Sequence, residues 1–468
     1  MEALNLEDIQ GFVLRQYLFP VLRHFLLKVG DPAAARAMIG RLVSGDENDA
    51  PQISTAEEAP PGTTYHLHLG ITYAGLVALQ VKEKLPNLAF KSFAAFVEGA
   101  APRAARVGDV GRHAPENWVG GFSTGNAHIL LTLYAARADI LDDYTTHLTK
   151  LFANTKAFEE LWHGDGAALT EVVNGQPVPV PKVHFGYTDG ISQVSIKGGP
   201  EPALPDHQQP CEPWLFVLSD DAENYYLPDP PELSRNGSFG VFKLIQQDVV
   251  GFENFLQSQK DKIDPELLAA KLMGRWRNGT PLMLSPETDS PRDGIKFDQM
   301  NDFGYVNADG SGDPRGLRCP IGAHIRRVNP RDQPVTGQGR PGGSNNSHRL
   351  VRRGMPYGPT YVPGQPDDGI ERGLLGYFIC SNIENQYEFV LKQWVNDGEF
   401  VGAVRMNPKC KDAIIGNNDP AESIFEIRQQ DHPDPIKITG IPDFLTTKAA
   451  AYCFLPSISA LKFIANLK

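Results

Sequence analysis

The sequence has few cysteines and no long apolar run. Its 468 residues include five cysteines, which are widely spaced and form no CxxC pair. An odd number of scattered cysteines argues against a disulfide framework and against a zinc site of the usual spacing. His66 and His68 would share one face of a strand, but no third ligand is suggested nearby, so we expect packing or surface residues. No stretch approaches the ~20 apolar residues of a membrane-spanning helix, and we expect no membrane partner.

The sequence also lacks an excess of positive charge. Its formal net charge is -12, whereas proteins that bind nucleic acid non-specifically neutralise phosphates with lysine and arginine. We therefore expect no nucleic-acid partner. Residues 1–10 are acidic and contain neither the basic nor the apolar region of a secretory signal. We expect a cytoplasmic protein, although a secreted protein without its signal would look the same.

What the sequence does contain is a repeated unit of a short apolar strand, a capping residue and an amphipathic helix. Asp31, Thr72 and Asp248 are expected to cap helices, because short polar side chains accept hydrogen bonds from the free amides of the first turn. Ser381 and Glu384 form the pattern of a capping box. The unit predicts strands at residues 24–29, 65–69, 128–134, 239–245 and 377–380, each followed by a helix.

Repeated strand–helix units with hairpin-like links predict an α+β fold, in which helices cover one face of antiparallel sheets. The ferredoxin-like arrangement is the usual small solution of this kind. A chain of this length is too long for one compact core. We therefore expect two ferredoxin-like domains with peripheral helices, residues 1–208 and 209–468, in a dimeric α+β barrel-like arrangement.

The segment from Cys319 to Asp332 carries the strongest chemical signal. It reads Cys-Pro-Ile-Gly-Ala-His-Ile-Arg-Arg-Val-Asn-Pro-Arg-Asp and places His324 beside three arginines. Neutral imidazole is a good iron ligand, and guanidinium is the usual partner of carboxylates. A haem presents an iron that needs an axial ligand and two propionates that need cations. The alternative is a core histidine beside a solvated basic strand.

A second candidate is Asp189, which lies in the segment Phe-Gly-Tyr-Thr-Asp-Gly-Ile-Ser-Gln at residues 185–193. The glycines on both sides permit unusual backbone angles and the close approach of another group. A carboxylate presented from such a loop can face a ligand. The alternative is a simple β-turn with an Asp-Gly pair.

A third candidate lies in residues 347–353, which we expect to form a strand. A strand would place His348 and Arg352 on one face and Arg353 on the other. One arginine of the pair would then point inward and need an anionic partner from the protein or from a ligand. A structural salt bridge is the alternative.

Taken together, these segments resemble the dye-decolourising peroxidase family. The family motif GxxDG is matched by residues 186–190, the motif GAHIRRxNPR by residues 322–331, and the motif RRGxPYG by residues 352–358. The resemblance spans nearly the whole chain. It implies two ferredoxin-like domains, with haem b held mainly by the second.

The resemblance also implies roles for individual residues. His324 would be the axial ligand of the haem iron, and Asp189 and Arg352 would lie on the distal side. Arg327 or Arg331 would pair with the propionates. Leu374 would line the distal wall, in a sequence that reads Gly-Leu-Leu-Gly at residues 373–376 where the family commonly has Gly-Leu-Leu-Phe.

The implied activity is that of a haem b peroxidase that uses hydrogen peroxide to oxidise dyes, phenolics or other organic reductants. A carboxylate over the iron can move a proton between the peroxide oxygens, and a fixed guanidinium can stabilise the charge on the departing oxygen. The alternatives are a haem-binding or carrier protein without turnover, and an interaction module without haem. A homo-oligomer is left open. Reductants too large for the pocket would need electron transfer through surface aromatic residues, among which the tryptophan candidates are Trp118, Trp162, Trp214, Trp276 and Trp394.

Overall fold

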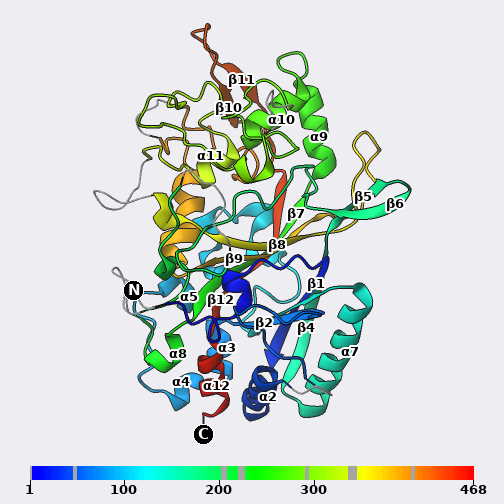
Figure 1. Ribbon diagram of the computed structural model, residues 1–468, viewed down its shortest axis with the longest axis vertical. Helices are drawn as coiled ribbons and strands as arrows, with labels where there is room; N and C mark the ends of the chain where they lie inside the picture. The colour runs from blue at the N-terminus through cyan, green and yellow to red at the C-terminus, as the bar shows by residue number, and fades with distance from the viewer. Residues whose placement is uncertain are drawn as a thin grey trace.

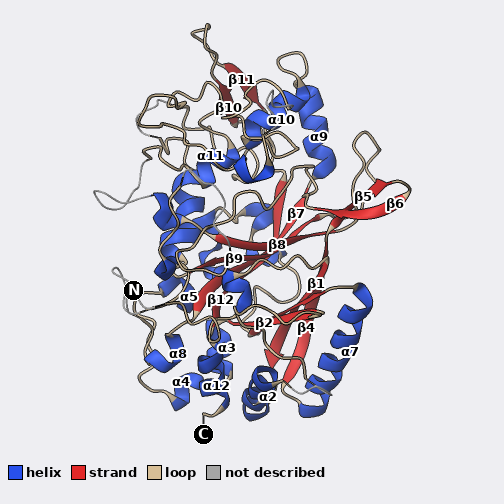
Figure 2. Ribbon diagram, viewed as in Figure 1, coloured by secondary structure: helices blue, strands red, loops and turns tan. Residues whose placement is uncertain are grey.

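One eight-stranded sheet runs through the molecule and connects its two halves (Figure 1). The structure is a computed structural model that describes residues 3–45, 50–201, 208–219, 227–289, 295–335, 345–401 and 406–467. The strand order of the sheet is β4-β1-β3-β2-β12-β7-β9-β8, and neighbouring strands are antiparallel. The helices lie around this sheet (Figure 2).

The first four strands of the sheet come from the N-terminal half. They are β1 (Val21–Val29), β2 (Tyr65–Ile71), β3 (Ile129–Ala135) and β4 (Phe158–Ala167), in the order β4-β1-β3-β2. Helix α2 (Pro32–Ser44) follows β1, and helix α7 (Ala138–Thr155) connects β3 to β4. This succession and strand order is the ferredoxin-like arrangement. The expected caps are present, since Asp31 accepts from the amide of Ala34 and Thr72 from that of Gly75.

The last four strands repeat the same order in the C-terminal half. They are β7 (Ser238–Gln247), β8 (Val351–Tyr357), β9 (Gly373–Cys380) and β12 (Leu445–Leu455), and they lie in the order β12-β7-β9-β8. If the four strands of each half are numbered in chain order, the strand order in both halves is 4-1-3-2. Helix α9 (Val249–Ser258) follows β7, and Asp248 caps it as expected. The α+β fold with two ferredoxin-like units is therefore confirmed.

The two halves contact each other at many points, and two of these contacts involve the strands of the sheet. Phe454 of β12 pairs with Ile71 of β2, which makes the sheet continuous. The two edge strands also approach each other, since a Cβ atom at Gly166 of β4 would lie 3.0 Å from that of Met355 of β8. The boundary expected at residues 208 and 209 falls in the long connection before β7, and the division into two domains stays a prediction.

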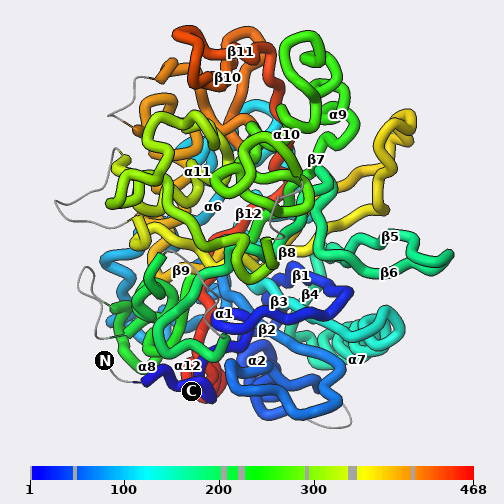
Figure 3. Tube along the Cα trace, turned by 45° about the horizontal axis from the view of Figure 1, so that its top comes forward, coloured from blue at the N-terminus to red at the C-terminus, as the bar shows by residue number. Residues whose placement is uncertain are grey.

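The other elements surround the sheet, and Figure 3 shows them in a second view. One expectation among them is wrong, namely the capping box at Ser381. The amide of Asn385 instead donates to the side chain of Asn382 at 3.0 Å, and the following residues form wide π-helical turns. The remaining helices and strands are α1 (Gly11–Leu14), α3 (Tyr73–Ala78), α4 (Val81–Lys84), α5 (Ala94–Glu98), α6 (Ala100–Arg103), α8 (Pro231–Ser234), α10 (Pro265–Met273), α11 (His324–Val328), α12 (Ile458–Ala465), β5 (Leu169–Val173), β6 (Gln176–Val180), β10 (Ile424–Ile427) and β11 (Ile436–Thr439).

His66 and His68 are packing residues, as expected. The ring of His68 stacks on Phe12 at 4.3 Å between centroids, and the ring of His66 stacks on Tyr17 at 3.7 Å. Within the described part of the chain, no group of three or more His, Cys, Asp or Glu side chains could hold a metal ion. The same residues include no helix that is long and apolar enough to cross a membrane.

Candidate active site

His324 is the first residue of α11, and a buried carboxylate holds its ring. Its Nδ1 lies 2.9 Å from Oδ2 of Asp412, and the other oxygen of Asp412 accepts from the amides of Ile414 at 2.8 Å and Ile415 at 3.0 Å. Burial alone would raise the pKa of Asp412, but the charge and hydrogen bond of His324 outweigh it, so this pKa is lowered. Because Nδ1 is engaged by the carboxylate, Nε2 is the atom left to bind a metal.

Asp412 is the functional residue that motif reasoning missed. It lies 88 positions after His324 in the chain, in a segment with no recognisable motif. The available signal was chemical, because a histidine that binds a metal usually donates its other ring N–H to a carboxylate or a carbonyl oxygen. That rule predicts a partner but does not say where in the sequence it stands.

Arg327, an expected propionate partner, belongs to α11, and its side chain is fully buried. Its Nε donates to the carbonyl oxygen of Gly322 at 3.3 Å, and Nη1 donates to that of Asp397 at 2.8 Å. The carbonyl oxygens of Trp394 and Cys410 accept its remaining hydrogen bonds. The guanidinium therefore joins four parts of the backbone. Since its donors point at these carbonyl groups, the geometry argues for a structural role.

Arg331 stands at the end of the same segment with a positive φ of 56°. Its Nη1 donates to the carbonyl oxygens of Asn301 at 3.0 Å and Phe303 at 2.8 Å. The guanidinium lies over the ring of Phe303, 3.9 Å from its centroid. Arg326 is fully buried and donates to Asp313, so the segment is not the solvated basic strand of the alternative interpretation.

Arg352 and Arg353 lie on opposite faces of β8. Arg353 points inward and is 8% exposed, and its Nε donates to the carbonyl oxygen of Phe12 at 2.8 Å. The expected anionic partner of the inward arginine is thus replaced by a carbonyl group. Arg352 is half-buried on the other face, and its Nη2 donates to the carbonyl oxygen of Ser192 at 3.2 Å. Ser192 belongs to the segment that also contains Asp189, so this bond brings the two distal candidates into one region.

The expectation that His348 shares a face with Arg352 is wrong. The strand begins only at Val351, and His348 ends a short 3-10 turn that precedes it. Its ring stacks on Phe389 at 3.8 Å, and its Nδ1 lies 2.6 Å from the carbonyl oxygen of Asn385. The alternation of strand faces therefore does not extend back to His348.

Asp189 is exposed at the end of a loop that glycine makes possible. Its Oδ1 accepts from the amide of Gly190 at 2.7 Å, and its own amide donates to the carbonyl oxygen of Pro181 at 2.8 Å. Gly186 has a φ of 85°, and a Cβ atom there would lie 2.9 Å from Nη1 of Arg277. The glycine thus allows both the turn and the approach of this arginine.

The face of β8 and β9 that carries Arg352 is open. Register places Gly354 opposite Gly376, beside the pair formed by Arg352 and Phe378, and Leu374 lies half-buried further along the same face. A Cβ atom at Gly376 would lie 2.1 Å from the carbonyl oxygen of Arg353, so a side chain there requires the backbone to shift. Gly354 is exposed, and a Cβ atom there would meet only the carbonyl oxygen of Leu375 at 3.6 Å.

These residues fit a haem. The His324–Asp412 pair leaves one ring nitrogen for an iron, and Arg352 stands on a sheet face where the exposed Gly354 carries no side chain. In both views α11 and the β8–β9 pair lie away from α2 and α7 (Figures 1 and 3). His324 and Arg352 thus both belong to the C-terminal half.

Known proteins with this sequence pattern are peroxidases. A dye-decolorizing peroxidase of Mycena epipterygia is 28% identical over 99% of this chain and 88% of the relative, and the multifunctional dye peroxidase of an Amycolatopsis strain is 27% identical over 98% and 96%. A solved dye-decolorizing peroxidase in complex with cyanide superposes with a TM-score of 0.82 at 26% identity, covering 99% of this chain and all of that one. The chain is therefore similar over nearly its whole length to dye-decolourising peroxidases. No protein-family model matches the sequence.

Dye-decolourising peroxidases are haem-dependent enzymes, and the similarity to them agrees with the geometry of the site. A second solved member, in complex with 2,6-dimethoxyphenol, has a TM-score of 0.80 at 26% identity, and covers 99% of this chain and all of that one. The similarity extends over both ferredoxin-like units, so it includes the α11 segment, the Asp189 loop and the β8–β9 pair.

Proposed function

We propose that the protein is a haem b peroxidase that uses hydrogen peroxide to oxidise dyes, phenolics or other organic reductants. The observation that carries the proposal is the bond of 2.9 Å between His324 and the buried Asp412, in a chain similar over its length to dye-decolourising peroxidases. The solved relative that binds 2,6-dimethoxyphenol supports a phenolic reductant.

The haem would be held mainly by the C-terminal half. His324 binds the iron through Nε2, and Asp412 fixes the ring orientation and makes the ligand more electron-rich. Arg327 or Arg331 would pair with the propionates; in this structure both guanidinium groups donate to backbone carbonyl oxygens. Leu374 lines the distal wall. The bound haem supplies the redox chemistry, which is intrinsic to the cofactor.

The distal residues handle the proton and the charge. Asp189 takes a proton from one peroxide oxygen and returns it to the other, and for this it needs an accessible carboxylate oxygen. Its Oδ1 is held by the amide of Gly190, while the described residues provide no hydrogen bond to Oδ2. Arg352 stabilises the negative charge on the departing oxygen, and a donor fixed in advance does so without reorganisation. Its bond to Ser192 holds the guanidinium beside the Asp189 segment.

The experiment that tests the proposal compares two histidines. We expect His324→Ala to lose stable haem and His348→Ala to retain it, because only His324 is supported by a buried carboxylate. Haem content is measured as the pyridine haemochrome, and turnover is measured with hydrogen peroxide and 2,6-dimethoxyphenol. The reverse pattern of haem content would refute the ligand assignment. Haem binding without turnover in the parent would favour the alternative, a haem carrier.

A further inference from the structure

The turn at residues 412–418, which carries the carboxylate partner of the axial histidine, is closed by an asparagine. Asn418 is 7% exposed, and its Nδ2 donates to the carbonyl oxygens of Asp412 at 2.9 Å and Gly416 at 3.1 Å. The amide of Gly416 donates to the same oxygen of Asp412 at 3.0 Å, and a Cβ atom at position 416 would lie 2.4 Å from it. The turn is therefore tight, and the side chain of Asn418 is one of the groups that keep it closed.

The backbone of Asn418 is held in turn by a residue outside the turn. Its amide donates to Oδ1 of Asp443 at 2.7 Å, and Oδ2 of Asp443 lies 3.1 Å from Nε2 of His113. The other ring nitrogen of His113 accepts from the amide of Thr447 at 3.1 Å, so the neutral ring carries its proton on Nε2 and donates it to Asp443. His113 is buried and belongs to the N-terminal half.

These contacts form one hydrogen-bond series that leads from the N-terminal half to the axial ligand. Its members in order are His113, Asp443, Asn418, Asp412 and His324. Hydrogen bonds between buried groups are strengthened by the low local dielectric, so each member restrains the orientation of the next.

We propose that Asn418 and Asp443 are positioning residues for the axial ligand, and that His113 anchors them to the N-terminal half. This inference rests on the proposed peroxidase function, because it concerns the iron that His324 would bind. The carboxylate of Asp412 makes the imidazole electron-rich only while it is aimed at Nδ1. Asn418 fixes the backbone of Asp412 and Asp443 fixes Asn418, so the bond of 2.9 Å at Nδ1 depends on both.

The other contacts of Asp412 do not replace this support. Its Oδ1 accepts from the amides of Ile414 and Ile415, but both residues belong to the same turn. If the turn opens, these amides move together with the carboxylate. The amide of Asp412 donates to the carbonyl oxygen of Val395 at 2.9 Å, which fixes the start of the turn and leaves its end to Asn418.

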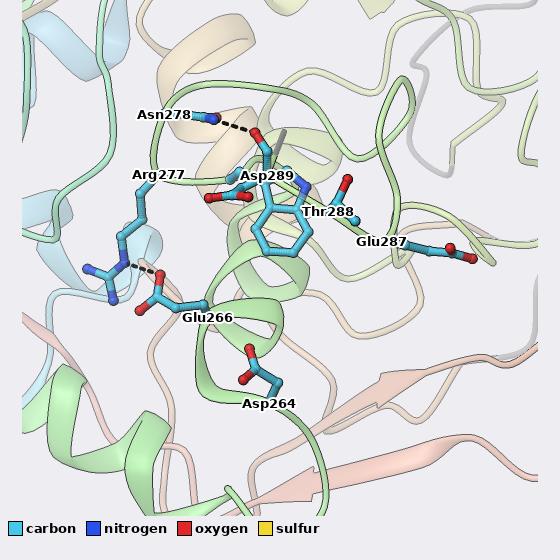
Figure 4. A pocket seen from close by; sticks show the side chains of 8 residues that line it. Asp264, Glu266, Arg277, Asn278, Glu287, Thr288 and Asp289 are labelled. Carbon is cyan, nitrogen blue, oxygen red and sulfur yellow. Dashed lines mark hydrogen bonds and ion pairs between the residues drawn. The ribbon is translucent and has the colours of Figure 1, made fainter. Parts of the chain in front are cut away.

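The test uses Asn418→Ala, which removes two hydrogen bonds without changing a charge, and Asn278→Ala as the matched control. The Nδ2 of Asn278 also donates to a backbone carbonyl oxygen, that of Asp289 at 2.5 Å, in the wall of a pocket beside α10 (Figure 4). Outer partners of a metal ligand contribute about 10- to 100-fold to metal binding, so a residue one bond further away should contribute about 3- to 10-fold. We expect Asn418→Ala to lose haem to apomyoglobin faster by this factor.

The reduction potential of the haem iron is the measurement that a merely structural role would not change. An electron-rich axial ligand favours ferric iron over ferrous iron, so weakening the bond at Nδ1 should raise the potential. A loss of about three- to tenfold in this preference corresponds to roughly 28–59 mV, at 59 mV per tenfold for one electron. Spectroelectrochemical titration measures the shift, and the iron–histidine stretching frequency of the ferrous protein should fall in the resonance Raman spectrum. Asn278→Ala should match the parent in both.

Asp443→Ala provides a second arm, in the parent and in an Asp412→Asn background. If Asp443 acts through Asp412, its removal raises the potential in the parent but not in the Asp412→Asn protein, because the two changes are then not additive. A rise of equal size in both backgrounds would mean that the charge of Asp443 acts on the iron directly, and would refute the hydrogen-bond series. This arm decides the matter if Asn418→Ala does not fold.

The outcomes separate this inference from the proposed function. A parent that takes up no haem, or binds it without turnover, refutes the peroxidase function. A parent that is an active haem peroxidase, with the same potential and the same stretching frequency in Asn418→Ala, refutes the positioning role alone, even if this variant unfolds more easily. Equal shifts in Asn418→Ala and Asn278→Ala refute it as well, because any loosened loop would then have the same effect.

Discussion

Acid should destabilise this protein through a buried histidine of its sheet. His24 of β1 is fully buried, with Nδ1 2.8 Å from Oγ1 of Thr132 and its ring against Phe242 and Tyr377. No hydrogen-bond partner of Nε2 is found among the described residues. Burial lowers the pKa of His24 to about 3, and the distant charge of Asp165 opposes this only weakly. The folded protein therefore keeps this ring neutral over most of the acid range.

The sign and size of the effect follow from the two pKa values. In the unfolded chain the pKa of a histidine is about 6.5, so below that pH the unfolded state binds a proton that the folded state does not. Stability therefore falls as the pH drops from about 6.5 towards the folded pKa of about 3. At about pH 4.5, two pKa units below the unfolded value, the loss is about 2.7 kcal/mol. That is a large part of the roughly 5–15 kcal/mol typical of a folded protein.

The assay compares the parent with His24→Gln, whose amide can still bond to Thr132 but does not titrate. Chemical unfolding of the haem-loaded proteins is followed at about pH 7.5 and at about pH 4.5. We expect the parent to lose about 2–3 kcal/mol more than His24→Gln between these conditions. His147→Gln, an exposed position on α7, is the control and should follow the parent. If His24→Gln loses as much stability as the parent, the ring is protonated in the folded state and the reasoning fails.

Three further predictions concern the site. Asp412→Asn should weaken haem retention by about 10- to 100-fold, because the axial histidine loses its anionic partner, and haem transfer to apomyoglobin measures this. Arg352→Leu should keep its haem but react with peroxide about 10²–10³ times more slowly in stopped-flow, and a rate close to the parent would exclude it as the distal donor. Asp189→Asn should slow the same step, because an amide does not accept and return the proton, and equal rates at every pH would exclude Asp189 as the acid–base group.

Local chemistry explains which parts of the fold were predictable from sequence. Asp31, Thr72 and Asp248 are caps that act within three residues, so the sequence contains the whole interaction. The strand–helix units predicted both ferredoxin-like halves for the same reason. The capping box expected at Ser381 does not form. The side chain of Asn382, one position further along, accepts from the amide of Asn385 instead.

The parts that sequence did not predict depend on contacts between distant segments. Strand alternation does not reach His348, because that ring is held by Asn385 and Phe389 and the strand begins only at Val351. Arg327 stays a predicted propionate partner, and its guanidinium donates to carbonyl groups up to 83 positions away, which the sequence did not indicate. Asp412 illustrates the same limit, since only the folded chain identifies it as the partner of His324.

Asp412 and Asp189 carry the same side chain in two different environments, and each environment suits a different function. Asp412 is fully buried, and His324 and two backbone amides together engage both of its oxygens, which favours the ionised form. A carboxylate held in this way stays charged and suits the support of a metal ligand. Asp189 is exposed at the end of a glycine loop, with one oxygen held by the next amide. Such a carboxylate can exchange a proton with a bound molecule and turn with its loop. Exchanging the two environments would therefore remove both functions, although both positions would still be aspartate.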